Sequence, residues 1–149
     1  MIQVFRQGRH WVMPLWRAQV EACVRAMLDQ AGAGDASLEL LLADDAELAR
    51  LNSCHLGLTG PTNVLAFPAE DEGGDESYGG ESSGNESLGL AAVSLEAVLR
   101  ESLLFGQDPA THLARLLAHG LLHLLGLDHG PHMEEETERL LDAGRGFLL

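Results

Sequence analysis

The alternation of apolar and polar residues divides the chain into four short strands and five helices. The predicted strands cover residues 1–6, 37–43, 62–68 and 88–93. The predicted helices cover residues 16–31, 44–51, 95–105, 109–125 and 133–143. The strand 37–43 alternates at first and then becomes continuously apolar, which is typical of the centre of a sheet. We therefore expect a core built from both kinds of element.

The helix predicted at 109–125 has the clearest ends. Asp108 is a good N-cap residue, Pro109 suits the first helical position, and Gly126 follows the last turn. Ser94 is the expected cap of the preceding helix, 95–105. These residues predict where the two helices begin and where the second one ends.

The size and composition of the chain predict one folded domain over residues 1–149. The chain has 149 residues, of which 46% are hydrophobic and 21% charged, as in soluble globular proteins. Residues 69–87 are almost all Gly, Ser, Asp, Glu and Asn, and we expect them to form a mobile acidic loop. No apolar run reaches the roughly 18 residues needed to span a bilayer, and no signal-peptide pattern is found, so we expect a cytoplasmic protein without membrane contact.

The strong negative charge argues against binding nucleic acid through a broad basic surface. Nine arginines and no lysine stand against 23 acidic residues, which gives a net charge of −14. Seven of the acids lie within 70–86, and no basic residue occurs between Arg50 and Arg100. Much of the imbalance is therefore local to one segment.

The segment 119–129, with the sequence HGLLHLLGLDH, contains three of the seven histidines. His119 and His123 are four residues apart on the predicted helix, so about 40° around the axis and about 6 Å along it separate them. Both imidazoles can reach one ion. Gly126 allows the chain to leave the helix, so that His129 can fold back as a third ligand.

Three neutral imidazoles with a fourth position left to water are typical of a catalytic zinc site. We therefore predict one zinc ion per chain, bound by His119, His123 and His129 and catalytic through its water, although nickel suits the same ligands. The alternative is that these histidines are ordinary residues of an amphipathic helix. Asp128 either orients His129 through the free ring nitrogen or forms a turn after the helix.

Two motifs resemble the YbeY family. HGLLHLLGLDH is similar to its H-G-x-L-H-L-x-G-x-D-H signature. Leu51 and Asn52, followed by PTNVLAFP at 61–68, resemble its Leu-Asn pair and its PTNVLSFP block. The resemblance covers about residues 37–130, with the motifs in the same order.

The resemblance implies an α/β fold of the α+β type, with a small, mostly parallel or mixed four-stranded sheet and about five helices, one of which carries the His-x3-His pair. It also implies a metal-dependent endoribonuclease that prefers single strands. Its implied partners are the 16S ribosomal RNA precursor, the small ribosomal subunit and associated proteins, and it implies no DNA substrate. The implied roles are maturation of the 3′ end of 16S ribosomal RNA and ribosome quality control.

Two positions depart from the family pattern. Leu56 stands where the family usually has an arginine, and Leu90 where it usually has an aspartate. An arginine binds phosphate through a charge-assisted fork, so its loss removes a strong contact. Arg115, four residues before His119, and Arg50 are the candidate replacements, the alternative being that both lie at the solvent edge of amphipathic helices.

Two other functions remain in competition with the nuclease. A zinc metalloprotease shares the histidine pair, but it needs a Glu after the first histidine, where this chain has Gly120. That glycine would instead leave room beside the ion for a phosphodiester. A non-catalytic, zinc-binding ribosome-assembly factor is favoured by Leu56, Leu90 and the acidity of the chain.

Overall fold

The computed structural model describes residues 2–7, 15–56, 62–69, 87–128 and 130–149. Along these residues the elements are β1 (Ile2–Arg6), α1 (Arg17–Gln30), β2 (Ser37–Ala43), α2 (Asp45–Leu56), β3 (Val64–Pro68), β4 (Ser87–Ser94), α3 (Leu95–Phe105), α4 (Pro109–Leu124), α5 (Pro131–Gly144) and a short 3-10 helix, Arg145–Leu148. The predicted succession of strands and helices is therefore confirmed.

The four strands form one mixed sheet in the order β1-β2-β4-β3. β1 pairs with β2 and β2 pairs with β4 in parallel, whereas β3 runs antiparallel to β4 at one end of the sheet. The fold is thus α/β with a mixed sheet, as expected. Because β3 lies at the end, only one of its two edges is paired with a described strand.

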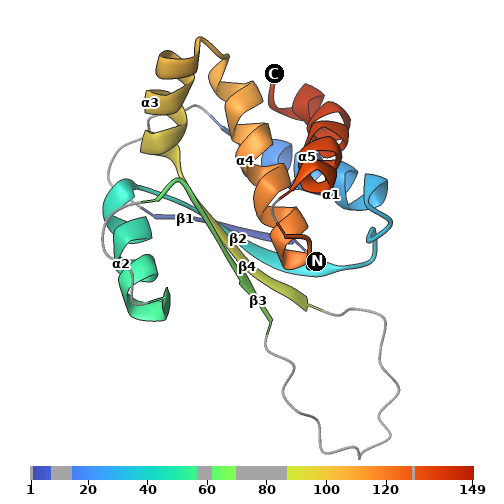
Figure 1. Cartoon of the computed structure of the whole chain (residues 1–149), viewed down its shortest axis with the longest axis horizontal. Coiled ribbons are helices and arrows are strands. Elements are labelled where there is room, and N and C mark those ends of the chain that lie inside the picture. The colour runs from blue at the N-terminus through green and yellow to red at the C-terminus, as the bar shows by residue number, and fades with distance from the viewer. Residues whose placement is uncertain (1, 8–14, 57–61, 70–86, 129) are drawn as a thin grey trace, which may run out of the picture.

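The two faces of the sheet pack against different helices (Figure 1). α1, α4 and α5 lie together on one face and enclose the larger apolar core, to which Ala91 and Val93 of β4 belong. α2 covers the other face with a smaller core, made of Ala43, Leu48, Leu51, Leu65 and Ala92. Successive residues of a strand point to opposite faces, so β4 serves both cores in alternation.

α4 is the central helix of the larger core. The Asp108 side chain accepts a hydrogen bond from the Thr111 backbone N–H at 3.2 Å, which confirms the predicted cap. At the other end Gly126 has φ +93°, and Leu127 N–H donates to the Leu122 carbonyl at 3.0 Å. This is the Schellman arrangement, in which glycine tolerates the left-handed backbone that turns the chain away.

One predicted boundary differs from the structure, and another falls mostly outside the described residues. α2 continues to Leu56, one turn and more beyond the predicted end at residue 51, so Arg50 lies inside this helix. The acidic segment predicted as a loop falls mostly outside the described residues, and Ser87 already belongs to β4. Within the part of the chain that the structure describes, no helix is both long and apolar enough to cross a membrane.

Candidate metal centre and adjoining cleft

His119 and His123 face each other from neighbouring turns of α4. Their Nε2 atoms are 3.1 Å apart, and the ring planes are inclined by 84° with centroids 4.6 Å apart. Both residues are half-buried, although the residues around them on the helix are almost all buried. The predicted pairing of these two imidazoles is therefore present in the fold.

The spacing of the two nitrogens fits a shared metal ion. Histidine nitrogens bind zinc at about 2.0–2.1 Å, and two nitrogens 3.1 Å apart can both lie at that distance from one ion. His129, the third predicted ligand, lies outside the described residues. The described residues alone contain no group of three or more His, Cys, Asp or Glu that could hold a metal. The pair could thus supply two of the four ligands of a tetrahedral site.

Two adjoining clefts run between β3 and the C-terminal half of α4. The larger, of about 470 Å³, is lined by Val64, Leu65, Ala66, Pro68, His123, Gly126, Leu127 and Asp128. The smaller, of about 260 Å³, is lined by Thr62, Asn63, Val64, Ala66, His119, Gly120 and His123. The histidine pair therefore forms one wall of a groove whose opposite wall is an edge strand.

Gly120 packs against the sheet. A Cβ built on Gly120 would lie 3.2 Å from Val64 Cγ2 and 3.7 Å from Ala91 Cβ. The glycine also lines the smaller cleft, but its first role is to let α4 approach β3 and β4 closely. The Cβ of a glutamate here, as a metalloprotease requires, would meet Val64.

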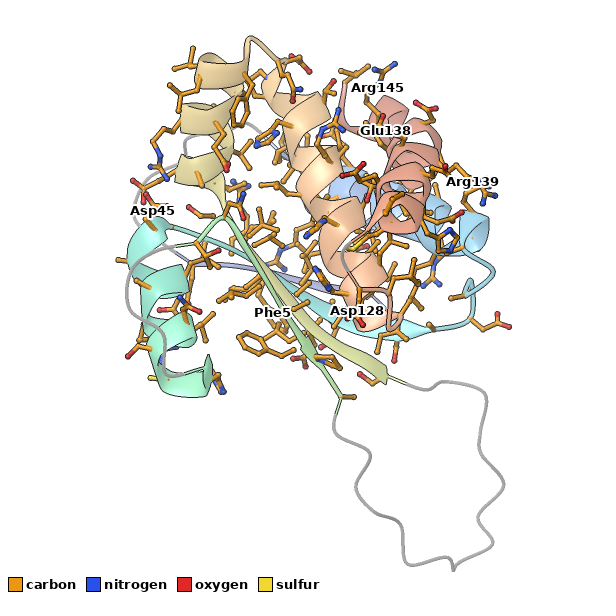
Figure 2. The ribbon with its side chains drawn as sticks, in the orientation of Figure 1. Phe5, Asp45, Asp128, Glu138, Arg139 and Arg145 are labelled. Carbon is orange, nitrogen blue, oxygen red and sulfur yellow. The ribbon has the colours of Figure 1, made fainter. Side chains whose placement is uncertain are left out.

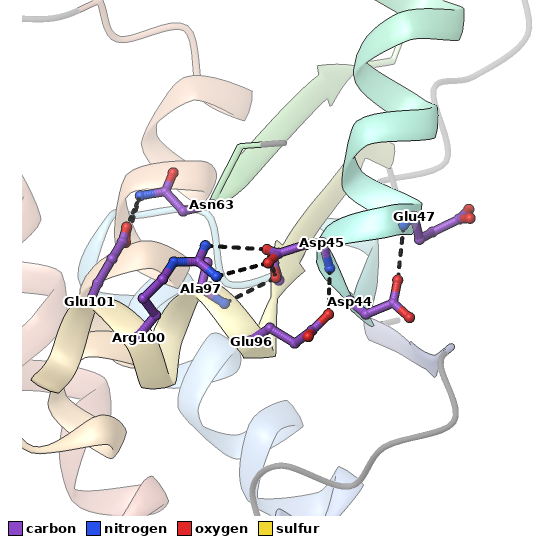
Figure 3. Close-up of polar contacts among 9 residues, drawn as sticks. Asp44, Asp45, Glu47, Asn63, Glu96, Ala97, Arg100 and Glu101 are labelled. Atoms are coloured by element: carbon purple, nitrogen blue, oxygen red, sulfur yellow. Dashed lines mark hydrogen bonds and ion pairs between the residues drawn. The ribbon is translucent and has the colours of Figure 1, made fainter. Parts of the chain in front are cut away.

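Polar contacts hold Asn63, which lies directly before β3; Figure 3 shows the one with Glu101. Asn63 Nδ2 donates to both carboxylate oxygens of Glu101, at 2.7 and 3.2 Å. His112 Nε2 lies 3.3 Å from Glu101 Oε2, and the buried His112 ring meets Phe105 edge-on. Asn63 and Glu101 were not predicted as site residues, because they are 38 positions apart and no local pattern indicates their contact.

Neither candidate replacement for the missing arginine lines the clefts. Arg115 forms an ion pair with Glu138 of α5, and in Figure 2 Glu138 lies far from the cleft residue Asp128. Arg50 pairs with Glu47 on α2, at 2.5 Å between Nη2 and Oε1. A phosphate contact by either residue stays a prediction, and it would require the guanidinium to leave its present partner.

The remaining sequence candidates have separate surroundings. Leu90 shares the strand parity of Ala92, so its side chain points toward the α2 side, opposite the histidine pair. Leu56 ends α2, and its side chain is outside the described part. His112 lies within hydrogen-bond distance of Glu101, while His55 contacts Phe67 with ring centroids 5.0 Å apart.

Comparison with known proteins gives a consistent result. The family described as Endoribonuclease YbeY has a sequence model that matches residues 5–146. Endoribonuclease YbeY of Oleidesulfovibrio alaskensis is 42% identical, over 95% of this chain and 90% of the relative. The protein of the same name from Nitratidesulfovibrio vulgaris is 36% identical, over 89% of this chain and 87% of the relative.

A solved structure supports the same fold. The solution structure of TM1509 from Thermotoga maritima covers 98% of this chain and 90% of its own, with a TM-score of 0.64 at 22% identity. At this identity the likeness shows the fold alone. The sequence matches extend over nearly the whole chain and include both motifs. On these grounds the chain belongs to the YbeY endoribonuclease family.

Proposed function

We propose that this protein is a metal-dependent endoribonuclease that cleaves single-stranded RNA with one zinc ion per chain, nickel being chemically compatible. His119 and His123 are the first two ligands and His129 the third. The observation that carries the proposal is the 3.1 Å between the two Nε2 atoms in the wall of a cleft. The names of its relatives support RNA as the substrate.

The chemistry of the groove suits this role. A zinc ion bound there supplies Lewis acidity toward a phosphate oxygen and lowers the pKa of bound water. α4 fixes both imidazoles from a rigid, buried helix, so their nitrogens need little rearrangement to act together. β3 closes the opposite side and limits the access of bulk water. The reacting phosphate would lie between these two walls.

A preference for single strands agrees with the lining of the groove. Among the described lining residues there is no lysine or arginine, so a duplex has no row of charges to bind. The walls offer apolar surface from Val64 and Leu127 instead. Unpaired bases can use such surface, whereas stacked and paired bases cannot.

The biological setting that we propose is the cytoplasm, where the substrate is the 16S ribosomal RNA precursor and the product is its mature 3′ end. The small ribosomal subunit and its associated proteins are the proposed partners, and ribosome quality control a second role. This part of the proposal rests on the family to which the chain belongs. The negative net charge limits unspecific binding to RNA, which fits a protein that reaches its RNA together with protein partners.

The two competing functions have different support. The packing of Gly120 against Val64 disfavours a metalloprotease, which would need a glutamate at that position. A non-catalytic assembly factor would keep the metal but lack turnover. The absence of an arginine or lysine from the described walls of the groove is the observation that favours it.

Metal content and cleavage measured on the same samples test the proposal. We expect H119A and H123A to lose both bound metal and cleavage of a single-stranded RNA, since each removes a ligand. H132A is the matched control, because His132 is an exposed histidine of α5. Duplex RNA and single-stranded DNA of the same sequence should remain uncut by the parent.

The possible outcomes separate the alternatives. Cleavage by H123A at the parental rate, or full cleavage in excess chelator, would refute the metal-dependent nuclease. A parent protein that binds metal and small ribosomal subunits but never cuts RNA would support the assembly factor. Cleavage of an unstructured peptide by the parent, lost in H123A, would support the protease.

A further inference from the structure

The hydrogen-bond register of β3 determines which of its backbone groups face away from the sheet. Ser94 N–H donates to the Asn63 carbonyl at 2.9 Å, and Ala69 N–H donates to the Leu88 carbonyl at 3.0 Å. Directly opposed residues of an antiparallel pair alternate between bonded and non-bonded positions. With Val64 opposite Val93, residues 63, 65, 67 and 69 therefore bond to β4. The N–H groups of Val64 and Ala66 point outward.

The position of Pro68 agrees with this assignment. Proline has no N–H and is tolerated in a sheet only where the ladder does not need one. Pro68 has the same parity as Val64 and Ala66, and its partner on β4 is Gly89. The outer edge of β3 thus presents two N–H donors, from Val64 and Ala66. Neither donates to another backbone group among the described residues.

This edge lies on the groove opposite the histidine pair. Val64 and Ala66 line both clefts, together with His123. Leu65 also lines the larger cleft, although its side chain is buried in the core on the α2 side. Neighbouring residues of a strand point their side chains to opposite faces. A cleft that is lined by consecutive strand residues is therefore expected to reach the main chain of the strand. The outward N–H groups therefore face the space where a substrate would lie.

Few charged side chains in the groove could bind an anion. No arginine or lysine lines either cleft among the described residues, and Asp128 is the only acid that does. Arg115 and Arg50 are paired with Glu138 and Glu47. Asn63 already donates its amide N–H groups to Glu101. In an acidic protein, fixed backbone N–H groups are the donors best placed to meet a phosphate.

We propose that the outward N–H groups of Val64 and Ala66 bind the phosphate backbone of the RNA opposite His119 and His123. The inference rests on the proposed function, because it assigns RNA binding to the wall of the groove that faces the histidine pair. Backbone donors on a strand are held in position before the substrate arrives, so they lose little on binding. They would also replace part of the contact that an arginine makes in relatives of the usual pattern.

Replacing Ala66 by proline removes one of these N–H groups and leaves the ladder intact. The residue before it, Leu65, is already extended, as a residue preceding proline must be. We expect A66P to lower kcat/KM for single-stranded RNA by roughly 100-fold, the usual effect of losing one aligned donor. A66S keeps the N–H with a side chain of similar size, so a loss in A66P beyond the loss in A66S measures the missing N–H alone. L65P removes a ladder N–H and should lower the unfolding temperature instead.

A second measurement needs no turnover and no variant. In ¹⁵N-labelled parent protein with chelator present, we expect single-stranded RNA to shift the amide resonances of Val64 and Ala66 more than those of Leu65 and Phe67. If the parent never cleaves RNA but these two amides shift, the proposed function fails and the edge assignment stands.

Three results would overturn the edge assignment. One is a folded A66P that cleaves and binds RNA like A66S. Another is RNA binding that leaves the Val64 and Ala66 amides unshifted. The last is a strand-forming peptide that shifts them where RNA does not, which would make the edge a protein-docking site.

Discussion

Two polar regions adjoin the same sheet, and they use different chemistry. At the corner between α2 and α3, Arg100 Nη1 donates to Asp45 Oδ2 at 2.8 Å, and Ser94 Oγ donates to Asp45 Oδ1 at 2.7 Å. Asp45 N–H in turn donates to Glu96 Oε1 at 3.0 Å (Figure 3). In the groove between β3 and α4, the polar lining is mainly imidazole, amide and backbone.

The comparison indicates that the corner stabilises the fold and that the groove serves the activity. At the corner each charged group named above has a partner from another element, so the charges hold two helices together. The groove has almost no charge of its own, and its donors face the space that a ligand would fill. Substitutions at the corner should therefore cost stability, and those in the groove should cost activity.

Glu101 of α3 holds the groove residue Asn63 and gives the largest expected effect. E101A leaves the half-buried Asn63 amide and the buried His112 Nε2 without this acceptor, which should lower the free energy of unfolding by about 2–3 kcal/mol. RNA cleavage should fall as well, because Asn63 lines the smaller cleft. Urea unfolding and cleavage assays check both effects.

The double variant E101A/N63A tests whether the contact itself is responsible. If Glu101 acts through Asn63, the double variant should be less destabilised than the sum of the two single variants. Simple additivity would place the effect of Glu101 elsewhere. E135A, at an exposed site on α5, is a control for loss of a glutamate.

Gly120 gives the next effect, through packing. G120A places a methyl group 3.2 Å from Val64 Cγ2; we expect this overpacking to outweigh the roughly 1 kcal/mol that alanine gains over glycine inside a helix, with a net loss of about 1 kcal/mol in the free energy of unfolding. V64A should relieve part of this cost, because it removes the methyl group that is met. If V64A and G120A are simply additive in thermal unfolding, close packing is the wrong explanation for the glycine.

The fold could be predicted from the sequence wherever one short pattern determined it. Asp108, Pro109 and Gly126 mark the ends of α4 by their own backbone preferences, and the structure has them in those roles. α2 was predicted too short, because its last turn contains Ser53 and Cys54 and shows no apolar period. Packing of Leu48 and Leu51 against the sheet carries the helix further than its local pattern indicates.

The site was predictable to a similar extent. The histidine pair follows from a spacing of four on one helix, which fixes the separation of the two rings. The roles of Asn63 and of the β3 edge follow from pairing across long sequence distances, such as residue 63 with residue 94. No local pattern encodes such a register. The groove can be located only from the order of the strands and from the face to which each strand residue points.

Replacing Ser94 should lower the stability of the protein without changing its activity, as expected for the corner. S94A removes the cap on the Ala97 N–H, 3.1 Å from Ser94 Oγ, and also the donor to Asp45. We expect a loss of about 1 kcal/mol in the free energy of unfolding and unchanged cleavage per folded molecule. S102A is the matched control, since its buried hydroxyl only donates to the Leu99 carbonyl one turn back. Equal losses in both variants would contradict a capping role.

The smallest expected effect is the response of the corner to acid. The hydrogen bond from Arg100 lowers the pKa of Asp45, and the hydrogen bond from Ser94 adds to the effect. A carboxylate whose pKa is lowered by folding stabilises the protein above the usual Asp pKa of about 3.9, and that contribution is lost as the pH falls through the lowered value. Since Arg100 is half exposed, we expect a contribution below about 1 kcal/mol.

Comparison with D45N isolates this contribution, because asparagine keeps an acceptor for Ser94 but has no charge to titrate. The parent and D45N differ only in this one carboxyl group. The stability difference between parent and D45N should therefore be constant near neutral pH and shrink below about pH 4. Urea unfolding at a series of pH values measures it. A difference that persists at pH 2 would mean that shape and hydrogen bonding hold the corner. The corner and the groove would then differ in packing rather than in charge.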